Sequence, residues 1–339
     1  MYSLVGSMPH EALRNLASKY GPLMHLKLGE ISNIIVSSPE MAQEIMKTQD
    51  LNFCDRPNLL FTRIWAYNRT SIAFGNYGDY WRHVRKICTM ELLTAKRVQS
   101  FRHIREKEVS ELVKAVSESE GSIFNLTQKI FSMIYGIAAR AAFVDVLLKF
   151  QEKDSEYPLT DDNIKAVIQE MFIGGGETTS SVVDWAMAEM IKKPKVMERA
   201  QAEVRRVYVP RENKEPCLIK RYQIPANSRI VTNAWAIGRD PKYWVDAESF
   251  MPERFLDSSI DYRGINFELI PFGAGRRICP GITFATPIME LPLAQFLYYF
   301  DWKLPNGMNN EELDMTELYG LTIRRRNDLC LIPIIHHQP

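Results

Sequence analysis

The chain has 339 residues, of which 46% are hydrophobic and 24% charged, and its formal net charge is +1. This composition is typical of a globular protein with a large core, and the balanced charge argues against nucleic acid as a partner. The five cysteines are scattered without CxxC-like spacing, which indicates a reducing compartment and argues against a zinc site. No apolar run reaches the ~18 residues of a membrane span, and the first residues lack the pattern of a signal peptide.

The first third of the chain predicts helices around one pair of strands. Apolar periodicity predicts helices at residues 9–20, 39–48, 81–90 and 94–119. Pro39 opens the second of these, because proline already has the helical φ there and its missing N–H costs nothing at a first position. Two strands at residues 24–28 and 31–37 flank a turn at Gly29.

The longest predicted helix begins after Thr160 and continues to about residue 191. Thr160 is a suitable N-cap, and Asp161 and Asp162 complement the positive end of the helix dipole. Further helices are predicted at residues 194–208 and 283–299, and extended chain at residues 209–231, 321–325 and 329–334. We therefore predict a mainly α fold with a small β portion, in which residues 1–339 form a single domain.

Two connections are abrupt, at residues 143/144 and 208/209. At Phe143 one helical pattern runs into another, and after Tyr208 a helix runs directly into extended chain. Short connections ordinarily carry Gly, Asn, Asp or Ser, and neither of these does. We interpret both positions as apparent internal junctions.

The most specific motif is F-x-x-G-x-R-x-C-x-G at residues 272–281, which places Cys279 at the end of a glycine-punctuated loop. A thiolate held in this way can bind heme iron, and thiolate ligation favours O–O bond cleavage. Gly275 and Gly281 allow the backbone to approach a flat porphyrin closely. Arg277 offers a planar fork of donors for a heme propionate, and Phe272 would shield the sulfur from water.

A lone cysteine is more commonly a buried structural thiol, but here the whole motif is present. On these residues the chain resembles the cytochrome P-450 heme-thiolate monooxygenases. The surrounding sequence is similar to the plant microsomal family 71, D-type, over nearly the whole chain. The resemblance implies the cytochrome P-450 fold and heme b (iron protoporphyrin IX) as the cofactor, with Cys279 as the metal ligand.

Three consecutive glycines at residues 174–176 lie inside the longest predicted helix. Each costs a helix ~1 kcal/mol relative to alanine, so a compensating reason is expected, such as close approach to a flat cofactor. An acid followed by a hydroxyl can relay protons through ordered water. The family's (A/G)-G-x-(D/E)-T-(T/S) motif implies that Gly174 and Gly175 border the dioxygen, and that Glu177 and Thr178 are catalytic residues delivering protons to it. Taken alone, the segment is equally compatible with a helix break.

Trp81 and Arg85 form a W-x-x-x-R pair. Residues four apart share a helix face, so the indole N–H and the guanidinium can point at one acceptor. The resemblance implies that this acceptor is a heme propionate, and it gives Arg211 the same role. The alternative for the pair is a surface helix with a packed tryptophan.

Three parts of the family pattern are missing from the chain: the N-terminal anchor, the helices that roof the substrate pocket, and the E-x-x-R helix. The last two correspond to the junctions at 143/144 and 208/209. In the family, the arginine of a P-E-R-F element, here Arg254, locks onto the E-x-x-R pair. Glu203 and Arg206 fit these letters, but their flanks match the preceding helix. Whether the segments are true deletions or an incomplete record is left open by the sequence.

We therefore predict a heme-dependent monooxygenase that inserts one oxygen atom from O2 into a small lipophilic substrate. The resemblance implies a terpenoid or alkaloid substrate, electrons from NADPH-cytochrome P-450 reductase, and the cytosolic face of the endoplasmic reticulum membrane as location, although this chain carries no anchor. Two alternatives remain: a truncated non-catalytic remnant with weak or no heme binding, and a heme-binding sensor.

Overall fold

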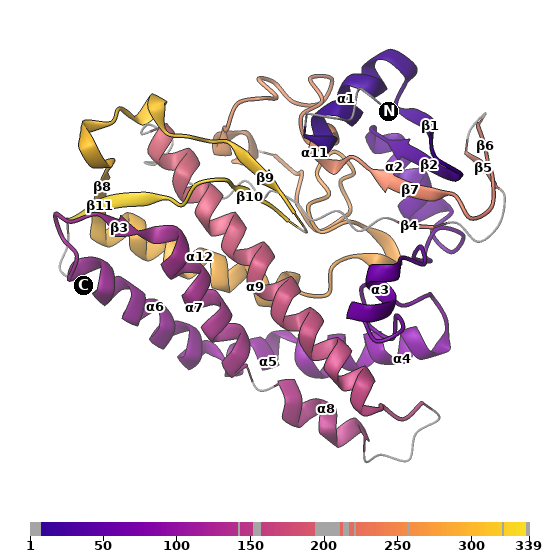
Figure 1. Cartoon of the computed structure of the whole chain (residues 1–339), viewed down its shortest axis with the longest axis horizontal. Coiled ribbons are helices and arrows are strands. Elements are labelled where there is room, and N and C mark those ends of the chain that lie inside the picture. Colours follow the sequence, from indigo (N-terminus) through magenta and orange to yellow (C-terminus); the bar gives the residue numbers. More distant parts are fainter. Residues whose placement is uncertain are drawn as a thin grey trace. The chain divides into compact units, whose positions relative to one another are not determined.

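The computed structural model of the chain describes residues 8–141, 143–151, 157–193, 211–212, 217–219, 222–256, 258–320 and 322–336. About half of these residues are helical, with short strands between the helices (Figure 1). The chain divides into two compact units. The first unit is Met1–Arg82, Arg206–Ser249 and Arg254–Cys279, and the second unit is His83–Arg205, Phe250–Glu253 and Pro280–Pro339.

The first unit contains a small sheet and short helices. Its helices are α1 (Pro9–Tyr20), α2 (Pro39–Gln43), α3 (Leu60–Trp65) and α11 (Ala234–Ile237). Its strands are β1 (Leu23–Leu28), β2 (Ile31–Val36), β4 (Arg211–Glu212), β5 (Cys217–Ile219), β6 (Tyr222–Ile224) and β7 (Arg229–Thr232). The predicted hairpin is confirmed, and the predicted helix at residues 39–48 is α2 continued by a π-helix, Glu44–Thr48. The predicted extended segment becomes strands β4 to β7.

The main sheet has the strand order β1-β2-β7-β4. β1 and β2 are antiparallel and are joined by a tight turn in which Gly29 has φ 62, a conformation that glycine adopts without strain. β7 lies parallel to β2, with Ile35 opposite Val231. This parallel pairing joins residues near the N-terminus to a strand almost two hundred residues later in the chain.

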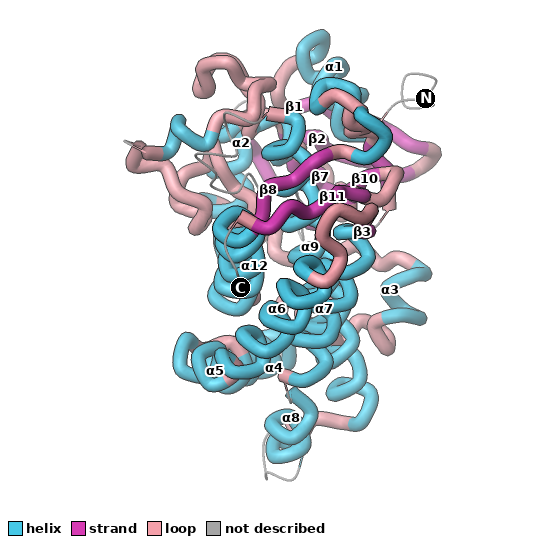
Figure 2. Tube along the Cα trace, turned by 90° about the vertical axis from the view of Figure 1, so that its left-hand side faces the viewer, coloured by secondary structure: helices cyan, strands magenta, loops and turns pink. Residues whose placement is uncertain are grey.

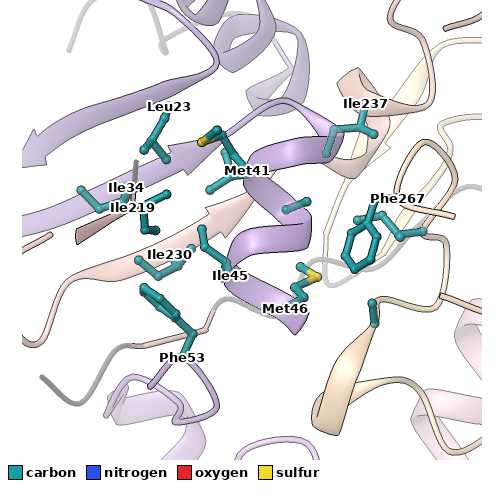
Figure 3. Packing of buried hydrophobic residues seen from close by; sticks show 14 of the residues in the cluster. Leu23, Ile34, Met41, Ile45, Met46, Phe53, Ile219, Ile230, Ile237 and Phe267 are labelled. Carbon is teal, nitrogen blue, oxygen red and sulfur yellow. The ribbon is translucent and has the colours of Figure 1, made fainter. Parts of the chain in front are cut away.

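The core of the first unit lies between this sheet and α2 (Figure 3). Met41 and Ile45, which are four residues apart and therefore on one helix face, point toward the sheet residues Ile34 and Ile230. The same cluster includes Phe267, Ile270 and Ala274, which precede Cys279 in the chain. Burial of these three side chains anchors the approach to the cysteine loop.

The second unit is a helical bundle with two small sheets. Its helices are α5 (Ala95–Ser100), α6 (Arg102–Ser117), α7 (Leu126–Arg140), α8 (Phe143–Gln151), α9 (Asp161–Lys192) and α12 (Ile282–Tyr299), and α4 (Asp79–Ile87) enters it from the first unit. Its strands are β3 (Phe124–Asn125), β8 (Phe300–Lys303), β9 (Glu317–Tyr319), β10 (Ile323–Arg325) and β11 (Cys330–Ile335). The predicted helix at residues 94–119 is wrong as one element, because Phe101 has the non-helical ψ of 7 between α5 and α6.

α9 is the central helix of the second unit, and α7 and α12 pack against it (Figure 2). Its start is confirmed: the Thr160 hydroxyl accepts from the Asn163 N–H, and the Asn163 side chain accepts from the Thr160 N–H. This reciprocal capping box satisfies donors that the first turn leaves without helical partners. Residues 179–188 are all buried, so this stretch of α9 is surrounded by protein on every side.

α7 ends at Arg140 and α8 begins at Phe143, so only residues 141 and 142 separate the two helices. The predicted helix at residues 194–208, the 208/209 junction, Glu203 and Arg206 all lie outside the described residues. Within the described part of the chain, no helix combines the length and the apolar character needed to cross a bilayer.

Candidate functional site

A backbone hydrogen bond closes the loop that carries Cys279: the Cys279 N–H donates to the Phe272 carbonyl at 2.9 Å. Gly275 lies inside this loop with φ 67, and a Cβ there would lie 2.0 Å from the Met46 carbonyl oxygen. Glycine is therefore required at this position for two independent reasons. The next N–H, of Arg276, donates to the buried carboxylate of Asp50 at 2.8 Å. The loop is thus held to the residues that follow α2.

Part of the loop is open. Gly273 has φ 71, and a Cβ built on it meets no atom of the described residues within 4 Å. The Cys279 side chain is half-buried rather than enclosed. The Phe272 ring packs against Tyr262, with centroids 5.8 Å apart. A half-buried cysteine in a loop with an unfilled glycine fits a flat ligand approaching the loop, so these residues are compatible with a heme bound through sulfur.

Arg277 is buried and hydrogen-bonded to backbone carbonyls of one segment. Its Nε donates to the Cys54 carbonyl at 2.6 Å, its Nη1 to Ile72 at 3.2 Å and its Nη2 to Gly75 at 2.6 Å. The sequence suggested a carboxylate partner for this fork, and the structure adds three carbonyl partners that lie more than two hundred residues earlier in the chain.

Trp81 is also buried, and its indole N–H donates to the Ile72 carbonyl at 2.8 Å. The Arg277 guanidinium carbon lies 4.1 Å from the centroid of the Trp81 ring. Trp81 and Arg85 are both on α4, as predicted, and Arg85 is half-buried. Arg211 begins β4, and its side chain lies outside the described residues.

The three glycines of α9 have different surroundings. A Cβ at Gly174 meets nothing within 4 Å among the described residues, and one at Gly175 would contact the Phe284 ring at an ordinary 3.5 Å. A Cβ at Gly176 would lie 2.5 Å from Cε1 of Tyr135, so Gly176 is required by the tyrosine ring. The unfilled side at Gly174 fits the predicted approach of a flat cofactor, whereas Gly176 has a packing role that the motif alone did not reveal.

The predicted proton-relay residues have defined partners in the second unit. The Thr178 hydroxyl donates to the Gly174 carbonyl, one turn earlier, at 2.5 Å. The carboxylate of Glu177 accepts from the Tyr135 hydroxyl at 3.2 Å and from the Thr322 hydroxyl at 3.1 Å. Burial, together with the charge of Glu177, raises the pKa of Tyr135 to about 12, so the phenol remains a donor. Sequence reasoning missed Tyr135 and Thr322, because neither belongs to a motif.

Gly281 is the N-cap of α12, and its carbonyl accepts from the Ala285 N–H at 2.8 Å. Its φ is −86, so this glycine does not use the left-handed region. Arg254, expected to need an E-x-x-R partner, donates to the Ser249 and Asp246 carbonyls at 2.8 and 3.1 Å, and its guanidinium lies 5.7 Å from the Trp244 ring centroid. The P-E-R-F arginine therefore has local partners within the first unit.

The model of the cytochrome P450 family matches this chain in three consecutive segments, residues 2–143, 136–208 and 207–331. The chain therefore belongs to the cytochrome P450 family, the heme-thiolate monooxygenases. Within this family it is of the plant 71D type: it is 54% identical to cytochrome P450 71D10 of Glycine max, over 98% of this chain and 88% of that protein. It is 41% identical to tabersonine 6,7-epoxidase isoform 1 of Catharanthus roseus, over 99% of this chain and 89% of that protein.

Among solved structures, a zebrafish cytochrome P450 determined with abiraterone aligns with a TM-score of 0.86. It is 20% identical and covers 97% of this chain and 100% of that chain, which shows the fold. The predicted mainly α cytochrome P-450 fold and the heme cofactor are confirmed by these matches. The alignment with the Glycine max protein extends over 452 residues, more than the 339 of this chain, so the relative carries additional internal residues.

Proposed function

We propose that this monooxygenase oxidises a small lipophilic substrate of terpenoid or alkaloid type, with electrons from NADPH-cytochrome P-450 reductase. The observation that carries the proposal is the loop closed by the Cys279 N–H and the Phe272 carbonyl, which presents a half-buried thiol beside the open face of Gly273. Heme held by this sulfur supplies the activation of O2. The protein supplies the ligand, the orientation and the path for protons.

In this proposal Cys279 binds the iron, and the other residues of the loop shape its surroundings. Arg277, Trp81, Arg85 and Arg211 hold the propionates. The single indole N–H of Trp81 already donates to the Ile72 carbonyl, so binding a propionate would require Trp81 to release that carbonyl. On the second unit, Gly174 leaves space on α9, and Glu177 and Thr178 hold and move the protons that the reaction consumes.

The substrate class is supported by an aromatic cluster and by the relatives. Phe61 and Trp65 of α3 stack with centroids 5.5 Å apart, and Trp65 lies 5.7 Å from Phe74. An apolar surface of this kind suits a lipophilic molecule rather than a charged one. Relatives are named for oxidation of tabersonine and for formation of salviol.

The reductase and the location are proposed from the family. Lys86 at the end of α4 and Lys96 at the start of α5 are exposed, and they suit an acidic flavoprotein surface. Plant relatives of this type are typically bound to the endoplasmic reticulum membrane, and we propose the cytosolic face of that membrane as the location of this protein.

The alternative of a non-catalytic remnant has its own support. The family model matches in three segments whose limits, near residues 143 and 208, coincide with the two abrupt junctions of the sequence. We propose that the pocket-roof helices and the E-x-x-R helix are absent at these places from an otherwise single monooxygenase domain. The local hydrogen bonds of Arg254 give this arginine partners that do not depend on an E-x-x-R helix.

One spectroscopic experiment separates these functions. The purified, heme-loaded chain is reduced and exposed to carbon monoxide, and the Soret band is recorded. We expect the strongly red-shifted band of a thiolate complex, and we expect Cys279→Ser to abolish it. Absence of the band from the wild-type chain would favour the remnant, and its survival in the serine variant would refute Cys279 as ligand. A sensor would show the band but no NADPH oxidation with reductase.

A further inference from the structure

Glu177 is held from two sides by hydroxyl groups of different elements. The Tyr135 hydroxyl, from α7, donates to Oε2, and the Thr322 hydroxyl, between β9 and β10, donates to Oε1. Each carboxylate oxygen therefore has its own donor. A glutamate has several rotatable bonds, and one donor on each oxygen restricts its rotation far more than a single contact would.

The two donors are themselves fixed. The Tyr135 ring lies directly against Gly176, where a Cβ would be 2.5 Å from Cε1, and its centroid is 4.9 Å from that of Phe172. Thr322 is only 7% exposed. The next residue, Ile323, is tied to the same helix, because its carbonyl accepts from the Trp185 indole N–H at 3.2 Å. Both hydroxyls are thus positioned by packing that does not depend on Glu177.

We infer that Tyr135 and Thr322 are positioning residues for the proton-relay carboxylate of Glu177, and that they fix the orientation in which this carboxylate transfers protons. The inference rests on the proposed function of Glu177. It adds that α7 and the β9–β10 hairpin, which carry no part of the family motif, determine the geometry of the proton path. Loss of either hydroxyl leaves one carboxylate oxygen without its protein donor and lets the side chain turn toward water.

The contact itself is tested without activity, by a double-variant cycle on urea unfolding of the heme-loaded chain. Tyr135→Phe and Glu177→Ala each remove one partner of the same hydrogen bond. We expect each to lower the unfolding midpoint, and the double variant to unfold close to Glu177→Ala alone. Additive shifts would overturn the inference.

The positioning role is tested by NADPH oxidation with reductase. By analogy with the outer-shell partners of metal ligands, whose loss costs about 10-fold or more in activity, we expect Thr322→Val and Tyr135→Phe to lower the rate about 10-fold. Thr322→Ser, which keeps the hydroxyl, should oxidise NADPH near the wild-type rate. Thr316→Val is the matched control, because Thr316 is exposed and donates only to Asp314 among the described residues. Variants that unfold more easily yet keep the full rate would show a merely structural role and overturn the inference.

The carbon monoxide band distinguishes a failure of this inference from a failure of the proposed function. A wild-type chain without the thiolate band would refute the proposed function, while the unfolding cycle would still decide whether Tyr135 and Glu177 interact. A chain with the band but with additive unfolding shifts would refute only the inference. If Tyr135→Phe does not fold, the valine and serine variants of Thr322 test the other oxygen of the same carboxylate.

Discussion

Arg277 and Trp81 share one acceptor: both donate to the Ile72 carbonyl, and the guanidinium lies over the indole ring, 4.1 Å from its centroid. The pair therefore connects three parts of the first unit: the cysteine loop, α4 and the segment at residues 54–75. A buried arginine is stable when its guanidinium lies over an aromatic ring and its N–H groups donate hydrogen bonds to carbonyls. The cysteine loop is thus braced before any ligand is considered.

The contacts of Arg277 predict that Arg277→Lys will strongly lower the free energy of unfolding. Lysine cannot reach the Cys54, Ile72 and Gly75 carbonyls together, and buried acceptors left without donors should lower the free energy of unfolding by about 3 kcal/mol. Urea unfolding measures this. Arg276→Lys is the matched control, since the Arg276 side chain is 44% exposed and a lysine keeps a charge near Asp50, so its effect should stay below about 1 kcal/mol. Equal losses of unfolding free energy in the two variants would contradict this stabilising role of Arg277.

Gly275 and Gly273 both have positive φ but different surroundings. Gly273→Ala should lower the free energy of unfolding by only about 1–2 kcal/mol, the cost of a left-handed backbone with a Cβ, because the added Cβ enters open space. Gly275→Ala adds a collision 2.0 Å from the Met46 carbonyl, which should raise the total to about 3–4 kcal/mol. Thermal unfolding of the two variants checks the order. A Gly275→Ala protein as stable as Gly273→Ala would show that the close approach to Met46 does not matter for stability.

Two glycines of α9 should respond in opposite directions to alanine. In the heme-free chain, Gly174→Ala fills open space and should stabilise the helix by about 1 kcal/mol. Gly176→Ala has the same helical advantage, but its Cβ meets the Tyr135 ring at 2.5 Å, so we expect a net loss of about 1–2 kcal/mol. Urea unfolding gives both values. Stabilisation by both substitutions would show that the ring moves aside freely.

The loss of stability at acid pH should depend on Glu40. A hydrogen bond from Tyr243 is the main cause that lowers the pKa of Glu40 from 4.5 to about 2. Because the pKa is lower in the folded state, this stabilisation is complete above pH 4.5 and is lost as the pH falls toward 2. Glu40→Gln and Tyr243→Phe should both flatten the unfolding free energy measured across this pH range. An unchanged slope in both variants would contradict this assignment.

Much of the candidate site was predictable because the signals are local. The start of α9 is one example, because the hydrogen bonds that cap it join Thr160 to a residue only three positions later. Signals of this kind can be read from the sequence. The cysteine motif is also local, because the closing bond joins Cys279 to Phe272, seven residues away. The prediction of a single helix at residues 94–119 was wrong for the opposite reason: no proline or glycine marks the non-helical Phe101, which lies buried between α5 and α6.

The sequence by itself determined the family and the heme cofactor, and it predicts the residues that would bind the heme, since a thiolate, glycines and paired donors must stand at fixed short spacings. Only the tertiary structure decided that Arg277 meets the carbonyls of residues 54, 72 and 75, and that Glu177 lies between Tyr135 and Thr322. These contacts join residues 42 to 223 positions apart. Such pairings depend on how helices and strands pack, and no local spacing encodes them.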